Sequence, residues 1–184
     1  ANYSDQAGNS SSTITRTLTK FTANPTLTMD SLAAAFVNGA NQGSYPLGGS
    51  CSAIGSPVTV TATSSESDST AAVATCLGLS WSTSLNLSSL GEGTITFTAN
   101  MSDAGGNPAP TPAPRVALKD SLGPSQPGAI NLSATTTNNL SITPEISWDS
   151  SSDGSEGSGI ASYEIALGTS SGTTGVLPWR SVGI

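Results

Sequence analysis

The stretch CLGLSWSTSLNLSSLGEGTITFTANMSDAGGN, residues 76–107, decides the fold class of this chain. Apolar residues alternate with polar ones on both sides of a Gly-rich break at 88–93, at Trp81, Leu85 and Leu87 before it and at Ile95, Phe97, Ala99 and Met101 after it. Strict alternation is typical of half-buried strands, and Gly-rich breaks mark chain reversals. The stretch therefore predicts a strand, a short corner, a second strand and a turn.

The composition fits an all-β protein with many tight turns. The 184 residues include 20 Gly and 11 Pro, and only 9% are charged, so Ser, Thr and Asn must supply most of the polar surface. Such a polar, uncharged chain could also be a disordered Ser/Thr-rich stalk. The alternating segments argue against a stalk, because they provide an apolar face that can be buried.

The charge balance disfavours two classes of partner. Five basic against twelve acidic residues give a net charge of −7, with no basic patch to displace counterions from nucleic acid or to bind anionic lipid. No run approaches the roughly 18–20 apolar residues of a membrane helix. We therefore expect neither nucleic-acid binding nor membrane insertion.

Two cysteines, Cys51 and Cys76, are the only thiols. With no His in the chain, they suit neither a metal site nor a catalytic thiol. A disulfide and two free buried thiols remain as alternatives. A disulfide would stabilise the fold by roughly 3–4 kcal/mol in the chain-entropy model and would indicate an oxidising compartment.

An internal repeat sets the domain boundaries. ANYSDQAGN (1–9) returns as ANMSDAGGN (99–107), and RTLTK (16–20) returns as RVALK (115–119). A repeat of this length has the size of one β-sandwich domain. We expect residues 1–22 to be the closing strands of a preceding copy, unless the two matched blocks are a coincidence.

Residues 23–120 are predicted to form a complete domain of about seven strands. The expected strands lie near Leu27 and Met29, before Cys51, at 58–63, at 71–76, on both sides of the break at 88–93, and at 115–119. The segment 31–37 fits either a strand or a short helical turn. A Pro/Gly-rich linker follows at 121–127.

Residues 128–184 repeat the same pattern with a different sequence. Strands are expected at 130–132, at 140–148 (with Leu140, Ile142, Ile146 and Trp148 on one face), at 163–167 and around Trp179. Four strands are too few to close a sandwich. We therefore expect the first part of a domain, whose missing strands come from chain beyond Ile184 or from another chain.

Residues 51–119 resemble the bacterial Ig-like repeats of large secreted adhesins and surface fibres. The resemblance rests on Cys51, on the Cys76…Trp81-Ser-Thr-Ser-Leu run, on the corner at 87–96 and on 102–107. Glu92 stands where that family usually has Asp. Residues 140–168 are similar to a fibronectin type III or related Ig-like domain, through Trp148, Tyr163 and the approach to Tyr163. The resemblance implies tandem antiparallel Ig-like β-sandwiches.

Catalysis is not expected, because a chain without His cannot form a Ser-His or Cys-His pair, and its carboxylates fall in turns. Calcium is the stronger hypothesis. Asp149, Asp153 and Glu156 share one Gly-rich loop, whose hard oxygen ligands suit Ca²⁺. Two further pairs lie near domain junctions, where adhesin repeats often bind calcium: Asp5 with Asn9, and Asp103 with Asn107. The alternative is that Asp and Asn cap their own turns.

The aromatic residues Trp81, Trp148 and Tyr163 are in phase with apolar strand positions, which favours core positions over a sugar-stacking platform. The resemblance implies a structural or adhesive module of an extracellular or cell-surface bacterial fibre protein. Its partners would be neighbouring Ig-like domains of the same protein, and surface glycans or proteins of another cell are further candidate partners. The alternatives are a glycan- or protein-binding module and an accessory domain of a secreted hydrolase.

Overall fold

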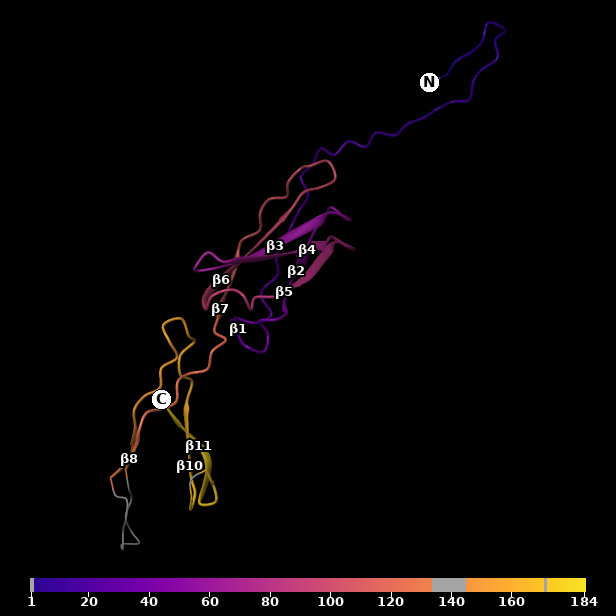
Figure 1. Ribbon diagram of the computed structural model, residues 1–184. Helices are drawn as coiled ribbons and strands as arrows, with labels where there is room; N and C mark the ends of the chain where they lie inside the picture. Colours follow the sequence, from indigo (N-terminus) through magenta and orange to yellow (C-terminus); the bar gives the residue numbers. More distant parts are fainter. Residues whose placement is uncertain (1, 134–144, 171) are drawn as a thin grey trace.

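The computed structural model describes residues 2–133, 145–170 and 172–184. These residues form strands, turns and extended segments, and none of them is helical. The molecule is elongated, with an N-terminal segment at one end, a β-domain in the middle and a group of short strands at the other end (Figure 1). The all-β prediction is confirmed for this part of the chain.

The central domain contains seven strands in two sheets. Five of them form a sheet in the order β1-β7-β6-β3-β4, and β2 pairs with β5 in a second sheet. Only β1 and β7 run parallel; the other pairs are antiparallel. The strands are β1 (Phe36–Val37), β2 (Tyr45–Ser50), β3 (Pro57–Ser64), β4 (Ser69–Thr75), β5 (Ser80–Leu85), β6 (Gly93–Met101) and β7 (Arg115–Lys119).

The core lies between the two sheets. Along β6, every second side chain from Ile95 to Met101 is buried, whereas the Thr residues between them are more exposed. Tyr45 of β2 stacks on Phe97 of β6 with ring centroids 5.3 Å apart, so the two sheets meet face to face. The alternation that predicted the strands therefore predicts the buried face as well.

Trp81 and the segment around Thr28 close one side of this core. The Trp81 side chain is buried, and its Nε1 donates to the Thr28 carbonyl at 3.0 Å. The Thr28 amide donates to the Ser50 carbonyl at 2.9 Å, so the segment near Leu27 and Met29, where a first strand was predicted, runs beside β2. Only one bridge, Leu27 to Cys51, is regular enough to count as strand pairing.

The two cysteines form a disulfide with their Cα atoms 5.9 Å apart. Cys51 directly follows β2 and Cys76 directly follows β4, so the bond connects the ends of two strands from different sheets. Of the two alternatives left open by the sequence, the structure contains the disulfide. The segment 31–37, also left open, ends in the short strand β1.

The four strands expected in residues 128–184 are present, but they form two separate two-stranded sheets. The strands are β8 (Ile130–Leu132) paired with β9 (Ile146–Trp148), and β10 (Tyr163–Leu167) paired with β11 (Leu177–Gly183). Leu140 and Ile142 lie outside the described residues. No described residue of this unit is buried. The tandem Ig-like β-sandwiches therefore stay a prediction.

The closing strands of a preceding copy, expected at residues 1–22, stay a prediction. Residues 16–20 match the sequence of β7 but are extended and take part in no strand among the described residues. A strand needs a neighbour for its backbone groups. β7 has two, β6 and β1, and residues 16–20 have no such ladder in the part of the chain that the structure describes.

Candidate functional site at the two ends of the central domain

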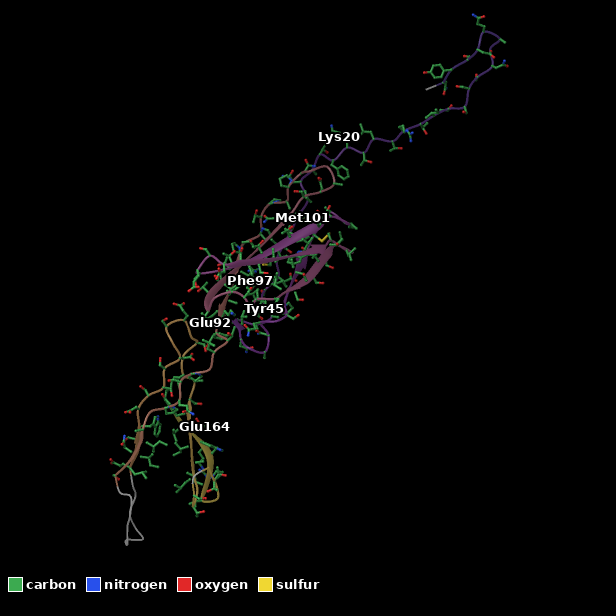
Figure 2. All side chains as sticks on the ribbon, viewed as in Figure 1. Lys20, Tyr45, Glu92, Phe97, Met101 and Glu164 are labelled. Atoms are coloured by element: carbon green, nitrogen blue, oxygen red, sulfur yellow. A yellow bond between two sulfur atoms is a disulfide. The ribbon has the colours of Figure 1, made fainter. Side chains whose placement is uncertain are left out.

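Two groups of polar contacts lie at the two ends of the central domain. Figure 2 shows Met101 at the end that faces Lys20 and the N-terminal segment, and Glu92 at the opposite end. We call the contacts at the first end, between the loop 102–108 and Phe21, the upper joint. The contacts at the second end, between the corner 91–93, residues 119–121 and the loop 153–158, are the lower joint.

Asp103 organises the loop of the upper joint. One carboxylate oxygen accepts the amides of Gly105 and Asn107, both at 2.9 Å. The other oxygen accepts the Asn107 side-chain amide at 2.9 Å. The hydrogen bond from the Asn107 side chain and those from backbone amides lower the pKa of Asp103, against a smaller opposing effect of desolvation. The loop is thus held by its own charged side chain, as in an Asx turn.

The N-terminal segment contains the same loop. Asp5 accepts the amides of Ala7 at 2.9 Å and of Asn9 at 2.8 Å, and it also accepts the Asn9 side chain at 2.8 Å. The glycines that follow have matching left-handed backbones, with φ of 86° at Gly8 and 85° at Gly106. The sequence repeat is therefore a structural repeat in this loop.

Phe21 makes the connection between the N-terminal segment and the upper loop. Its carbonyl accepts the Asn107 side chain at 3.5 Å. Gly105 sits so close to the ring that a Cβ built on it would lie 2.6 Å from the Phe21 Cβ. This contact requires a residue without a side chain at position 105.

At the lower joint, Glu92 holds the chain as it leaves the domain. Its carboxylate accepts the Ser121 amide at 2.8 Å and the Ser121 hydroxyl at 2.5 Å. Lys119, which is buried, lies 3.5 Å from the same carboxylate and donates to the Leu90 carbonyl at 2.5 Å. Burial raises the pKa of Glu92, but the Ser121 hydrogen bonds and the Lys119 charge outweigh it, so the pKa is lowered overall.

The loop of the following unit reaches back to the same corner. The Ser158 amide donates to the Asp120 carboxylate at 2.7 Å, and the hydrogen bonds from the Ser158 side chain and from this amide lower the pKa of Asp120. A Cβ built on Gly93, whose φ is 98°, would lie 2.6 Å from the Glu156 carboxylate. The lower joint is therefore a close contact between two units, and Gly93, like Gly105 at the upper joint, lies where an added side chain would meet the neighbouring segment.

The predicted calcium ligands are only partly brought together. Asp153 and Glu156 line an open hollow with Glu92 and Asp120. Asp149 is not part of that lining and lies against Gly128 instead. Among the described residues, no three acidic or thiol side chains are arranged to hold a metal ion. Calcium binding therefore stays a prediction.

The aromatic residues fall into two groups. Trp81 is a core residue, as predicted. Trp148 and Tyr163 are only partly buried, with ring centroids 5.5 Å apart. They line an apolar groove between β8–β9 and β10–β11, together with Ile130, Leu132, Ile146, Ile165, Leu167, Leu177 and Trp179.

The joint residues Phe21, Gly105, Asp120 and Ser121 were not among the predicted site residues. A signal for two of them was present in the sequence. Phe21 and Asp120 occupy equivalent positions in the two copies, directly after the repeated Lys. The change from an aromatic to a charged residue indicates that the two ends of the central domain make different contacts.

No helix in the described part of the chain is long and apolar enough to span a membrane. Comparison with known proteins finds no matching family model and no matching curated protein. A solved structure, described as a tetra-tandem repeat in the extending region of a large adhesion protein, aligns with 24% identity and a TM-score of 0.46. The alignment covers 62% of this chain and 28% of that one. Likeness at this level assigns neither the fold nor the function.

Proposed function

We propose that this chain is a structural module of a bacterial surface or secreted fibre protein. In this proposal, the central domain is an Ig-like sandwich that acts as a semi-rigid spacer between neighbouring Ig-like units of the same protein. The observation that supports it is the pair of ordered joints at opposite ends of one buried core. A domain that contacts a neighbour at each end can hold the neighbouring units in a fixed relative orientation.

The disulfide supports the placement of this module outside the cytoplasm. Disulfides persist in oxidising compartments such as the periplasm and the cell surface. Cys51 and Cys76 join strand ends of two different sheets, so the bond opposes the separation of the sheets if the chain is pulled. An extracellular or cell-surface location follows from the proposal.

Small-angle X-ray scattering of the whole chain tests the spacer function. We expect a single elongated shape to fit the scattering, and we expect the double variant Phe21→Ala/Asp120→Ala to need a broader ensemble of shapes. Thr59→Ala, on the exposed face of β3, is the matched control and leaves the scattering unchanged. If the unmodified chain already needs a broad ensemble, it is not a semi-rigid spacer.

A second candidate function is recognition of a glycan or a protein on another cell. The groove that contains Trp148, Tyr163 and Trp179 favours it, because exposed aromatic side chains can supply contact area for a partner. A glycan array with a clear hit that is lost in Trp179→Ala would favour glycan recognition over the spacer function.

We also propose that the module has no catalytic activity of its own.

The groove could also be the place where another chain pairs with this unit. A strand from another chain could complete the unit of residues 128–184, and the mass of the purified chain in light scattering would then be that of an assembly. The accessory-domain alternative depends on a catalytic domain elsewhere in the same gene product.

A further inference from the structure

We propose that each joint is specified by a matched pair of residues, and that this pairing determines which unit can follow which along the protein. One member of the pair is the residue directly after the repeated Lys. The other is the residue that it contacts on the next unit. The inference rests on the proposed spacer function for its biological meaning, but its geometry is independent of that function.

The repeat allows both members to be compared between copies. Lys20 and Lys119 are equivalent, so Phe21 and Asp120 occupy the same position in the two copies. In the loops, Ala7 is equivalent to Gly105, and both stand in the same hydrogen-bonded turn. Both members of the pair therefore differ between the copies, although the surrounding loop geometry is the same.

The upper joint pairs an aromatic side chain with a glycine. Phe21 is about half-exposed, and it occupies the space that a side chain at position 105 would need. An Ala at position 105 would place its Cβ 2.6 Å from the Phe21 Cβ, closer than carbon atoms can approach. The loop at residues 5–9 has such an Ala at position 7, so it cannot accept a Phe in this arrangement.

The lower joint pairs a carboxylate with a backbone amide. Asp120 accepts the Ser158 amide at 2.7 Å, a hydrogen bond strengthened by the charge of the acceptor. Phe at this position would have no acceptor for that amide. Asp at position 21 would have no apolar contact to make, and would bring a second carboxylate toward a loop that already carries Asp103.

The consequence is directional. A repeat that ends in Lys-Phe fits in front of a repeat that has Gly two residues after the loop Asp, as Gly105 follows Asp103. The repeat that ends in Lys119-Asp120 fits in front of a unit whose loop offers a backbone amide to the carboxylate, as Ser158 does. The central domain therefore acts as an adaptor, with a repeat-type joint on one side and a different joint on the other.

Solution NMR of the whole chain tests the upper pair. We expect a nuclear Overhauser contact between the Gly105 Hα and the Phe21 side chain, and its loss in Gly105→Ala and in Phe21→Ala. Ala104→Ser, on the exposed neighbour of Gly105, is the matched control and keeps the contact. Unchanged Phe21 ring shifts in Gly105→Ala would overturn the upper pair.

Amide exchange of Ser158 tests the lower pair. We expect its rate to rise by about tenfold in Asp120→Ala and in Asp120→Phe, because a charge-assisted hydrogen bond is lost. Asp120→Asn keeps an oxygen acceptor, so its effect is smaller. An unchanged Ser158 rate in Asp120→Ala would overturn the lower pair.

Both tests include a check on folding. The fluorescence of the buried Trp81 and the chemical shifts of β3 and β6 report whether the central domain is intact, because none of the substituted residues Phe21, Gly105 and Asp120 is buried. If the pairs are confirmed but the scattering shows a broad ensemble, the pairing stands and the spacer function fails. If the chain is rigid but both pairs are absent, the spacer function stands and the pairing proposal fails.

Discussion

Gly49 shows how strongly one residue can constrain the core. It lies on β2, where an added Cβ would collide with the Thr28 carbonyl and lie 2.8 Å from the Trp81 Nε1. Gly49→Ala would therefore push away the segment that accepts the Trp81 hydrogen bond. We expect a loss of about 2–4 kcal/mol in the free energy of unfolding, combining overpacking with a disturbed hydrogen bond. Urea denaturation followed by Trp fluorescence measures it.

The matched control for this prediction is Gly43→Ala. Gly43 is exposed, and a Cβ built there meets no atom within 4 Å. We expect its effect to stay within about 0.5 kcal/mol, as for most surface substitutions. Equal midpoints for the Gly49 variant and the unmodified chain would contradict the packing described around Trp81.

The Asp103 loop is predicted to be sensitive to acid. Hydrogen bonds lower the pKa of Asp103 below the ordinary value of 3.8. The ionised Asp103 therefore stabilises the folded loop, and this contribution is fully present above pH 3.8. That contribution is lost as the pH falls through the lower pKa of the folded state. We expect the Gly105 and Asn107 amide signals to shift together in that range. In Asp103→Asn this shared transition is absent, and its persistence would show that another group causes it.

At this scale the sequence allowed two readings of Asp5, Asn9, Asp103 and Asn107. Their spacing is compatible both with calcium ligands and with an Asx turn. The structure shows the turn, since three N–H groups bond to each carboxylate, Ala7 or Gly105 among them, and calcium binding by these residues stays a prediction. A residue pattern states which groups are present, but only the backbone geometry decides which donors reach them.

The disulfide is the element-scale connection between the sheets. The cysteines are 25 residues apart, and β3 and β4 lie in the loop that they close. We expect Cys51→Ala/Cys76→Ala to lose about 3–4 kcal/mol of unfolding free energy, in the chain-entropy model for a loop of this length. Denaturation with and without reductant measures it, and the reduced chain should match the double variant. A reduced chain as stable as the oxidised one would contradict the prediction.

The acidic loop 149–159 remains the element on which calcium is predicted. Ligand binding to the folded state raises the melting temperature. We therefore expect a higher melting temperature with Ca²⁺ than with EGTA, and a smaller difference in Asp153→Asn/Glu156→Gln. Both side chains line the hollow at the lower joint. Identical melting curves in Ca²⁺ and EGTA would remove the hypothesis.

Strand positions were predictable where each strand has one buried face. The β6 alternation, with Ile95 and Phe97 inward, and the position of β7 are both as predicted. The segment 31–37 was not decidable, because it pairs over only two residues, Phe36 and Val37, and short apolar runs carry no clear period. Residues 16–20 belong to no strand among the described residues, because a similar pattern forms a ladder only when neighbours supply the backbone partners, and their role as closing strands of a preceding copy stays a prediction.

The order of the strands within the sheets, and the joints between the units, could not be predicted from sequence patterns. Joints depend on contacts between residues far apart in sequence, such as Asp120 with Ser158 and Phe21 with Gly105. Neither pair follows from a local period or a motif. The repeat nevertheless reveals where to look, since copies that share a loop must differ at their contacts if their neighbours differ.

For the whole molecule, burial is concentrated in one unit. All buried apolar side chains among the described residues lie between Pro25 and Ala117, whereas the described parts of residues 2–22 and 128–184 have none. Buried apolar area is the main source of stability, so the central domain should be the most stable part of the chain. We expect amides of β3 and β6 to exchange only on global unfolding, and those of β8 to β11 to exchange at least about a hundredfold faster.

Hydrogen exchange followed by mass spectrometry separates this expectation from its alternative. Gly49→Ala should accelerate exchange in β3 and β6 and leave β8 to β11 unchanged, because the latter strands share no core with Trp81. If β8 to β11 are as protected as β3, the groove at Trp148 and Tyr163 must be covered in solution, since exposed two-stranded sheets are marginal by themselves. Protection that falls on dilution would then identify another molecule as the cover, and protection independent of concentration would place it within the chain.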